Sequence, residues 1–248
     1  MIYGAILASG KGTRMNSASN IPKQFMKLGD KPIIIHTIEK MLESDRFDYL
    51  YIAVPHDLYD YSIDMISEYI DTSKLDKINI ISGGKERMDS IQNIITSISK
   101  NDSVNEDDII VIHDAVRPFI TKKIIDDSIE GVKQYGAVVA SIPVSDTLLI
   151  SEDGNNINQI PKRSLYYKGQ TPDSFNLKLF INLFNNLTEE QKKEATGTSQ
   201  VCSLNNYPIH IVPGDDINFK ITTESDLVIA ESIIKGSDQY RNKSRNIK

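Results

Sequence analysis

The sequence predicts an α/β protein with a mostly parallel sheet and helices on both of its faces. Short apolar runs alternate with longer segments whose apolar residues recur every three or four positions, as in strands alternating with amphipathic helices. The first apolar run, residues 2–8 (IYGAILA), shows no polar alternation, which is typical of a parallel strand buried on both faces. With 248 residues, 40% of them hydrophobic, the chain is long enough to bury a sizeable core.

Strands and helices are predicted to follow one another regularly through the first part of the chain. The strands are placed at residues 2–8, 49–54, 78–81, 109–113 and 137–144. The helices are placed at residues 34–42, 58–70, 91–98 and 124–135, where the apolar side chains share one helix face. Right-handed crossovers are expected between the parallel strands.

The alternation breaks at about residues 145–168, which are polar and contain the turn-forming run Asp153-Gly154-Asn155-Asn156. We interpret this segment as a protruding β-arm. The elements predicted after it are a helix over 175–187, a short helix from 188, strands at 209–212 and 219–222, and a last helix that begins with a capping box at 223–226. Residues 1–235 are therefore interpreted as a single domain, and the polar tail 236–248 is expected to fray.

Composition narrows the class of protein. The chain has 28 Lys and Arg against 34 Asp and Glu, a net charge of -6, which argues against a nucleic-acid partner. The single cysteine, Cys202, excludes an intrachain disulfide and a cysteine-based zinc cluster, and it fits a reducing, cytoplasmic location. No apolar run approaches the ~18 residues of a membrane span, so no membrane association is expected.

The loop after the first strand has the features of an anion-binding site. Residues 9–15 (SGKGTRM) combine two glycines with two cations, and Lys23 follows shortly after; such a loop can turn its backbone N–H groups toward an anion. It is not a Walker A loop, because Gly12 follows the lysine where Ser or Thr is needed. It is also a poor dinucleotide fingerprint, because Met15 stands where the third glycine belongs. The alternative is a solvated loop that happens to contain Lys and Arg.

Four sequence blocks in a fixed order add a specific resemblance. They are residues 7–15 (LASGKGTRM) with 22–25 (PKQF), 83–90 (GGKERMDS), 113–118 (HDAVRP) and 218–222 (NFKIT). Together they resemble the cytidylyltransferases that act on 2-C-methyl-D-erythritol 4-phosphate or ribitol 5-phosphate, over about residues 2–234. The resemblance implies a Rossmann-like sheet, and a β-arm that builds a homodimer.

The resemblance also implies a reaction, in which a polyol phosphate attacks the α-phosphorus of CTP and expels pyrophosphate. A phosphate monoester has a second pKa near ~6 and is largely ionised at neutral pH, so no general base is required. The difficulty is to bring two anions together, and cations must be placed where charge develops. The resemblance gives this catalytic role to Arg14, Lys23 and Lys220.

Further roles follow from the matching positions. The residues expected to bind the nucleotide are Ala8, Ser9, Gly10, Gly12, Thr13, Gly84, Lys85 and Ser90. Asp114, at the end of a predicted strand, is expected to hold Mg²⁺ or another divalent cation; the alternatives are a helix N-cap or an ion pair with Arg117. The residues expected to bind the acceptor are Arg117, Thr147, Arg163, Thr171 and Thr198, those on the arm acting partly across the dimer.

This sequence departs from the family pattern in two places. Lys85 stands where many members have an acid or a small residue, and Ser199-Gln200 follows Thr198 where an acid usually stands. Three segments, residues 20–25, 32–40 and 169–172, favour the ribitol 5-phosphate branch and thus teichoic acid or polysaccharide biosynthesis. Residues 113–115 are closer to the methylerythritol branch of isoprenoid biosynthesis, which stays the alternative.

Two other classes are less favoured. An NAD-dependent oxidoreductase needs a third glycine and an acid about 20 residues beyond the loop, but Asp57, which ends the second strand region, lies more than forty residues away. A non-catalytic nucleotide-binding protein is expected to have lost a cation or the metal position. The sequence retains Arg14, Lys23, Asp114 and Lys220.

Overall fold

A computed structural model describes residues 1–10 and 21–245 of the chain, with side-chain surroundings up to residue 236. The main sheet in these ranges has the strand order β5-β4-β1-β6-β8-β7-β9. Its strands are β1 (Ile2–Leu7), β4 (Tyr49–Val54), β5 (Ile78–Ser82), β6 (Ile109–Asp114), β7 (Ala137–Pro143), β8 (Tyr167–Asn176) and β9 (His210–Pro213). β8 runs antiparallel to both of its neighbours, β6 and β7, and the other paired strands are parallel. The mostly parallel sheet predicted from the sequence is confirmed.

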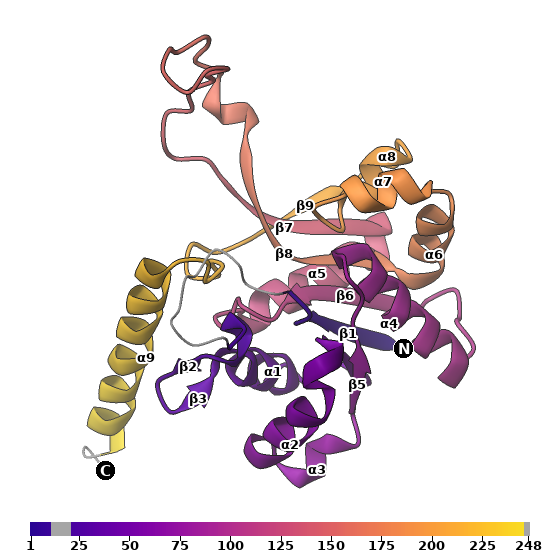
Figure 1. Cartoon of the computed structure of the whole chain (residues 1–248), viewed down its shortest axis with the longest axis vertical. Helices are drawn as coiled ribbons and strands as arrows, with labels where there is room; N and C mark the ends of the chain where they lie inside the picture. The colour runs from indigo at the N-terminus through magenta and orange to yellow at the C-terminus, as the bar shows by residue number, and fades with distance from the viewer. Residues whose placement is uncertain (11–20, 246–248) are drawn as a thin grey trace.

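Helices pack on both faces of this sheet (Figure 1). The helices α1 (Ile33–Glu43), α2 (Tyr59–Tyr69) and α5 (Lys122–Tyr135) cover one face, and α4 (Arg87–Asn101), α6 (Leu177–Asn185) and α8 (Gln200–Leu204) cover the other. Strand β6 shows why both faces are apolar, because Ile109 and Val111 enter one core while Ile110 and Ile112 enter the other. The continuous apolar run of such a strand therefore places its carboxyl end, Asp114, at the edge of a rigid layer.

Strand β8 was not predicted, and the reason is its composition. Its sequence, YKGQTPDSFN, has no apolar run, yet Gln170, Thr171, Asp173 and Ser174 are buried in it. The helix expected from residue 175 begins at Leu177, where the Asn176 side chain accepts a hydrogen bond from the Leu179 backbone N–H at 2.9 Å. Polar side chains inside a central strand need partners. Gln170, Thr171 and Asp173 have theirs around the candidate site, whereas Ser174 Oγ has none among the described residues.

The segment predicted as a strand at 219–222 is not one, and this prediction was wrong. The segment belongs to the connection between β9 and the last helix, α9 (Glu224–Arg245). It is held to the body by a backbone hydrogen bond of 2.9 Å from Ile221 N–H to the Val116 carbonyl, and the Ile221 side chain is buried among residues that include Ala230 of α9 and Leu28. The apolar alternation here reflects anchoring of a loop and not sheet pairing.

The remaining elements are short or differ little from expectation. Several short elements were not predicted: β2 (Lys27–Leu28), β3 (Lys31–Pro32) and α3 (Thr72–Leu75); the short helix expected from residue 188 is α7 (Glu189–Glu194). The capping box expected before the last helix corresponds to Asp226, whose carboxylate accepts hydrogen bonds from the backbone N–H groups of Thr222 and Thr223. Helix α9 continues through most of the segment expected to be a polar tail.

Residues 144–166 project from the end of the sheet between β7 and β8 (Figure 1). A bridge between Ile150 and Gln159 closes the arm into a loop, and the Asp153 carboxylate accepts the backbone N–H groups of Asn155 and Asn156 at its turn. Several of its large apolar side chains are exposed: Leu149, Ile150, Ile157, Ile160, Leu165 and Tyr166. Within the described ranges no helix combines the length and apolar character that crossing a bilayer requires.

Candidate active site

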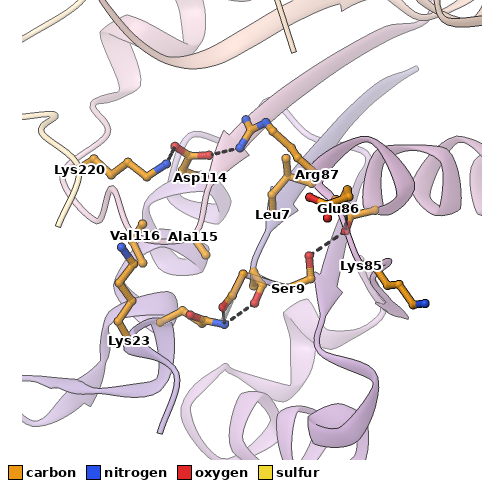
Figure 2. A pocket seen from close by; sticks show the side chains of 14 residues that line it. Leu7, Ser9, Lys23, Lys85, Glu86, Arg87, Asp114, Ala115, Val116 and Lys220 are labelled. Carbon is orange, nitrogen blue, oxygen red and sulfur yellow. Dashed lines mark hydrogen bonds and ion pairs between the residues drawn. The ribbon is translucent and has the colours of Figure 1, made fainter. Parts of the chain in front are cut away.

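A cavity of about 300 Å³ opens at the carboxyl ends of β1 and β6, beside the N-terminus of α4. Its walls come from five separate parts of the chain (Figure 2). The lining residues are Leu7, Ala8, Ser9, Gly10, Lys23, Gln24, Lys85, Glu86, Arg87, Ser90, Asp114, Ala115, Val116 and Lys220. In open α/β sheets ligands bind at this edge, because the strand ends leave a crevice there.

The Asp114 carboxylate lies among the cationic side chains of this cavity (Figure 2). Its Oδ1 accepts a hydrogen bond from Arg87 Nη1 at 2.7 Å, and its Oδ2 lies 2.9 Å from Lys220 Nζ and 3.5 Å from Arg117 Nε. Burial opposes the charged form of this carboxyl, but the charges of Arg87, Lys220 and Arg117 outweigh it and hold the pKa of Asp114 well below its usual range. Asp114 is therefore ionised whenever the protein is folded at ordinary pH.

A buried hydrogen-bonded chain fixes Asp114 from behind. The backbone N–H of Asp114 donates to Thr171 Oγ1 at 3.1 Å, and Thr171 Oγ1 lies 2.8 Å from His113 Nδ1. His113 Nε2 lies 3.1 Å from the Arg117 carbonyl oxygen. Burial lowers the pKa of His113 to about 4, so the ring is neutral and can accept from Thr171 while it donates to the carbonyl. Thr171 and His113 thus orient the strand end and do not face the cavity.

Lys220 is placed by contacts between its loop and β8. Asn218 Nδ2 donates to Gln170 Oε1 at 3.2 Å and to the Thr171 carbonyl at 2.9 Å. Arg117 Nη1 donates to the Asn218 carbonyl at 2.9 Å, so Arg117 ties this loop to Asp114. Because β8 is rich in polar residues, it was not predicted as a strand. Two of these residues, Gln170 and Thr171, hold the loop that carries Lys220.

A second set of contacts brings the first loop against the start of α4. Ser9 Oγ lies 2.7 Å from Ser90 Oγ, which also accepts the Gly84 backbone N–H at 3.0 Å. A Cβ on Gly84 would lie 2.0 Å from the Asp89 Cβ, and one on Gly83 would lie 2.4 Å from the Ser9 Cβ. The two glycines are thus required by close packing of the protein itself, and not only, as the sequence suggested, by a base lying against the backbone.

The structure brings most of the predicted site residues together. Those that line the cavity are Ala8, Ser9, Gly10, Lys23, Lys85, Ser90, Asp114 and Lys220, while Gly84, Arg117 and Thr171 support it from behind. Gly12, Thr13 and Arg14 lie outside the described residues. Thr198 is fully buried and touches the cavity only through Arg87, whose Nε and Nη2 both lie 3.4 Å from Thr198 Oγ1.

Two predicted acceptor-binding residues do not join the cavity within this chain. Thr147 and Arg163 lie exposed on the arm, and Arg163 Nη1 donates to the Ser145 carbonyl at 2.6 Å. The arm projects from the end of the sheet (Figure 1), and the lining of the cavity includes no arm residue, so these two side chains are positioned for contact with something other than their own chain's cavity.

Gln24 and Arg87 lie in the sequence blocks that carry the resemblance, but sequence reasoning gave Gln24 no role and interpreted Arg87 only as a possible structural residue. Gln24 is buried and its Nε2 donates to the carbonyls of Ala8 and Gly10 at 2.5 and 3.0 Å, so it anchors the turn that carries Lys23. Arg87 is the first residue of α4, where a cation opposes the helix dipole. A cation at this position is unfavourable for the helix, although the capping box of Glu86 and Asp89 shows that a helix begins there. This conflict in the sequence could have indicated a functional role for Arg87.

Two carboxylates line the cavity, Asp114 and Glu86. Glu86 is exposed and caps α4, so Asp114 is the one considered as a ligand of a divalent cation. Among the described residues no group of three or more His, Cys, Asp or Glu side chains could hold a metal ion. Mg²⁺ needs few protein ligands, because it keeps several waters and takes phosphate oxygens from its substrate. Asp114 fits that requirement, since it is ionised, lines the cavity, and each carboxylate oxygen has two lone pairs.

A second buried carboxylate gives a testable dependence of stability on pH. Burial raises the pKa of Asp173 to about 6 against an ordinary value of 3.8, so between these pH values the folded state binds more protons than the unfolded state. The free energy of unfolding should therefore fall as pH rises from about 4 to 6, by on the order of 2 kcal/mol. Denaturant titrations of D173N should show a flatter profile over this range, and an equal fall in both proteins would contradict the assignment.

Comparison with known proteins gives matches over nearly the whole chain. Residues 2–236 match the family described as 2-C-methyl-D-erythritol 4-phosphate cytidylyltransferase (IspD). Over 235 residues the chain is 40% identical to the ribitol-5-phosphate cytidylyltransferase of Lactiplantibacillus plantarum, a match that covers 95% of this chain and 99% of that protein.

Solved structures agree with the fold. The 4-diphosphocytidyl-2C-methyl-D-erythritol synthase of Anaerococcus prevotii superimposes with a TM-score of 0.77 at 23% identity, covering 94% of this chain and 98% of that one. The 2-C-methyl-D-erythritol 4-phosphate cytidylyltransferase of Francisella tularensis gives a TM-score of 0.75 at 26% identity, covering 92% and 97%. These similarities support the mostly parallel sheet observed here.

Proposed function

The chain belongs to the IspD family of cytidylyltransferases, and from that premise we propose that it joins CTP to ribitol 5-phosphate, giving CDP-ribitol and pyrophosphate. The observation that carries this proposal is the arrangement of cations in one cavity. Lys23, Lys85 and Lys220 come from three separate parts of the chain and line the same space, whose one buried carboxylate is Asp114. Such a cavity suits a reaction in which both substrates, CTP and a polyol phosphate, are anions.

The proposed reaction is an in-line displacement. A phosphate oxygen of the acceptor forms a bond to the α-phosphorus of CTP, and the bond from that phosphorus to the bridging oxygen of the β-phosphate breaks. Pyrophosphate leaves with the electron pair of that bond. The acceptor phosphate is ionised already, which agrees with a site whose only nearby histidine, His113, is buried and neutral within the described chain.

Each part of the cavity has a role in this proposal. Ser9, Ser90 and the backbone of Gly84 hold the nucleoside at the start of α4, where the positive end of the helix dipole also faces the ligand. Lys23 and Lys220, with Arg14 outside the described residues, offset the charge that develops on the triphosphate. Lys220 is held by Asp114, and the turn of Lys23 by Gln24, before the substrates arrive, so these two cations need little reorganisation during the reaction.

We assign Mg²⁺ to the CTP that enters the site, with Asp114 as its protein ligand. When bound there, the ion would neutralise phosphate oxygens of the triphosphate. Arg87, Arg117 and Lys220 keep the Asp114 carboxylate ionised and hold it at the cavity wall.

Ribitol 5-phosphate is the favoured acceptor because a ribitol-5-phosphate cytidylyltransferase is 40% identical over nearly the whole chain. The similar solved structures, at 23% and 26% identity, are named as enzymes of methylerythritol compounds. The family model that matches residues 2–236 carries the same substrate in its description. 2-C-methyl-D-erythritol 4-phosphate is therefore the alternative acceptor.

The arm supports a homodimer in this proposal. Its exposed Leu149, Ile157, Ile160 and Leu165, each at least 56% exposed, form more apolar surface than an isolated arm is expected to leave in water. A partner that covers these side chains would bring Thr147 and Arg163 near its own cavity, where the planar fork of Arg163 suits the acceptor phosphate.

A reducing compartment such as the cytoplasm suits the single buried Cys202.

The proposal is tested by measuring pyrophosphate release with CTP, Mg²⁺ and a panel of polyol phosphates. We expect the highest kcat/KM with ribitol 5-phosphate and no release when CTP or Mg²⁺ is omitted. A preference for 2-C-methyl-D-erythritol 4-phosphate would overturn the acceptor, and no release with any member of the panel would overturn the proposed function.

In the same assay R163A should raise the KM for the acceptor and leave the KM for CTP nearly unchanged.

A further inference from the structure

Arg87 lies between Asp114 and two buried polar residues that the proposed reaction does not use. On the cavity side, its Nη1 donates to Asp114 Oδ1 at 2.7 Å. On the protein side, Thr198 Oγ1 lies 3.4 Å from both Nε and Nη2. Thr198 is completely buried, whereas the Arg87 side chain is 21% exposed and lines the cavity. Any effect of Thr198 on a bound molecule must therefore pass through Arg87.

Thr198 is itself held by a carboxylate deeper in the protein. Its side chain forms a hydrogen bond with Asp173, and the same carboxylate accepts the Ser199 backbone N–H at 3.2 Å. Asp173 is 3% exposed and lies on β8, a central strand. The order Asp173, Thr198, Arg87 thus runs from the rigid sheet to the cavity wall, and it sets the plane of the guanidinium.

The hydrogen-bond count leaves part of Arg87 available. A guanidinium has five N–H donors in a fixed plane. Asp114 takes one on Nη1, and Thr198 takes Nε and one on Nη2. One N–H on each terminal nitrogen has no partner among the residues that the structure describes. These two donors lie on the group that also lines the cavity.

The charge of Arg87 is already offset, because Asp114 is bonded to it and Asp173 acts on it through space. A neutral hydroxyl oxygen is consequently a better match for its two open donors than another phosphate. The proposed acceptor is a polyol, whose hydroxyls can accept such bonds. The mismatch of Arg87 with the α4 helix dipole is then explained by a role in binding.

We infer that Arg87 binds the polyol hydroxyls of the acceptor, and that Thr198 is a positioning residue that acts only through Arg87. This inference rests on the proposed function for the identity of the acceptor class. It changes the role that sequence resemblance implied for Thr198, which was direct contact with the acceptor. It also supplies a side chain for acceptor recognition in a chain that has Ser199-Gln200 where the family usually has an acid.

A double-mutant cycle separates indirect from direct action of Thr198. T198V removes the hydroxyl at nearly constant volume, and R87M removes the guanidinium while Asp114 keeps Lys220 and Arg117. We expect T198V alone to raise the KM for the acceptor about tenfold, as for one hydrogen bond to a charged group, with the KM for CTP changed less than about twofold. In the R87M background, T198V should change the acceptor KM no further.

The cycle has clear contrary results. If the effects of T198V and R87M on the acceptor KM multiply, Thr198 acts separately and the inference fails while the proposed function stands. If either variant raises the KM for CTP instead, Arg87 binds the nucleotide and the inference also fails. T198S, which keeps the hydroxyl, should recover most of the lost affinity, and S203A, an exposed serine on α8, is the surface control.

The acceptor and the fold are checked independently. The cycle is run with whichever polyol phosphate the wild-type protein uses best, so an error in the acceptor does not affect it. Should the wild-type protein release no pyrophosphate, acceptor binding measured by calorimetry replaces the KM, and equal affinity of wild type and R87M would overturn the inference. Where R87M fails to fold, R87K keeps the charge without the planar fork, and the same non-additivity with T198V is expected.

Discussion

Replacing Asp114 by asparagine should lower kcat by about a thousandfold or more, with the protein still folded. Asparagine keeps the shape of the side chain but removes the charge that holds Arg87, Lys220 and Arg117 together at 2.7, 2.9 and 3.5 Å. Without that anion the three cations repel one another, and the proposed ligand of Mg²⁺ is lost. Loss of one preorganised electrostatic contact already costs on the order of a hundred- to a thousandfold. Pyrophosphate release over a range of Mg²⁺ concentrations measures the effect.

The same strand provides a matched control for this prediction. Asp108 lies just before β6, is 1% exposed, and pairs with the N-terminal ammonium at 2.5 Å. D108N therefore removes another buried, ion-paired carboxylate, at the opposite end of the strand from the cavity. Both variants should lose unfolding free energy, about 3–5 kcal/mol, but only D114N should lose turnover. Full activity of a folded D114N protein would remove Asp114 from the mechanism.

Those elements of the fold that carry one strong periodic signal were predictable from the sequence. Strand β6 is a run of apolar residues that ends in Asp114, and α4 repeats its apolar residues at Ile91, Ile94, Ile95 and Ile98. Each pattern reports burial against a large apolar surface, which local sequence encodes directly. The same pattern predicted that Asp114 stands at the carboxyl end of a strand, which is where ligands bind in open α/β sheets.

Strand β8 shows where such prediction ends. Its buried polar side chains have distant partners: Asp215, 45 residues away, for Gln170 and His113, 58 residues away, for Thr171. A partner of Asp173 is the Ser199 backbone N–H, 26 residues away. A hydrogen bond between distant segments produces no periodic pattern of apolar residues in the local sequence. The segment was therefore interpreted as polar and not as a strand. Arg87 escaped assignment for the same reason, because its partners Asp114 and Thr198 lie 27 and 111 residues away.

The roles of Lys23 and Lys220 depended on matching motifs, since most lysines are simply solvated. The structure adds a physical reason to each. Lys220 is bonded to Asp114, and the turn of Lys23 is anchored by the buried Gln24. The Lys220 ammonium and the turn that carries Lys23 are thus held at one cavity by polar contacts that form only in the folded protein. A comparison of kcat with KM shows whether such a cation acts on the transition state or only on substrate binding.

Replacing Lys23 by alanine should lower kcat by about a hundred- to a thousandfold and change the KM for CTP far less. Lys23 lies in the 3-10 turn Lys23–Phe25 and lines the cavity, and Gln24 fixes that turn to the carbonyls of Ala8 and Gly10. A cation fixed in this way offsets charge that grows on the triphosphate only as the leaving group departs, so its loss affects the transition state more than the bound substrate.

The measurement is a comparison of kcat and the KM for CTP in K23A, with K27A as the control. Lys27 lies four residues further on, in β2, and is exposed, so K27A removes the same charge from the same region outside the cavity lining. K27A should match the wild-type protein in both constants. A K23A protein with an unchanged kcat and a raised KM would show that Lys23 binds the ground state and the transition state equally, and the electrostatic account of catalysis would then have to rest on Lys220 and the metal.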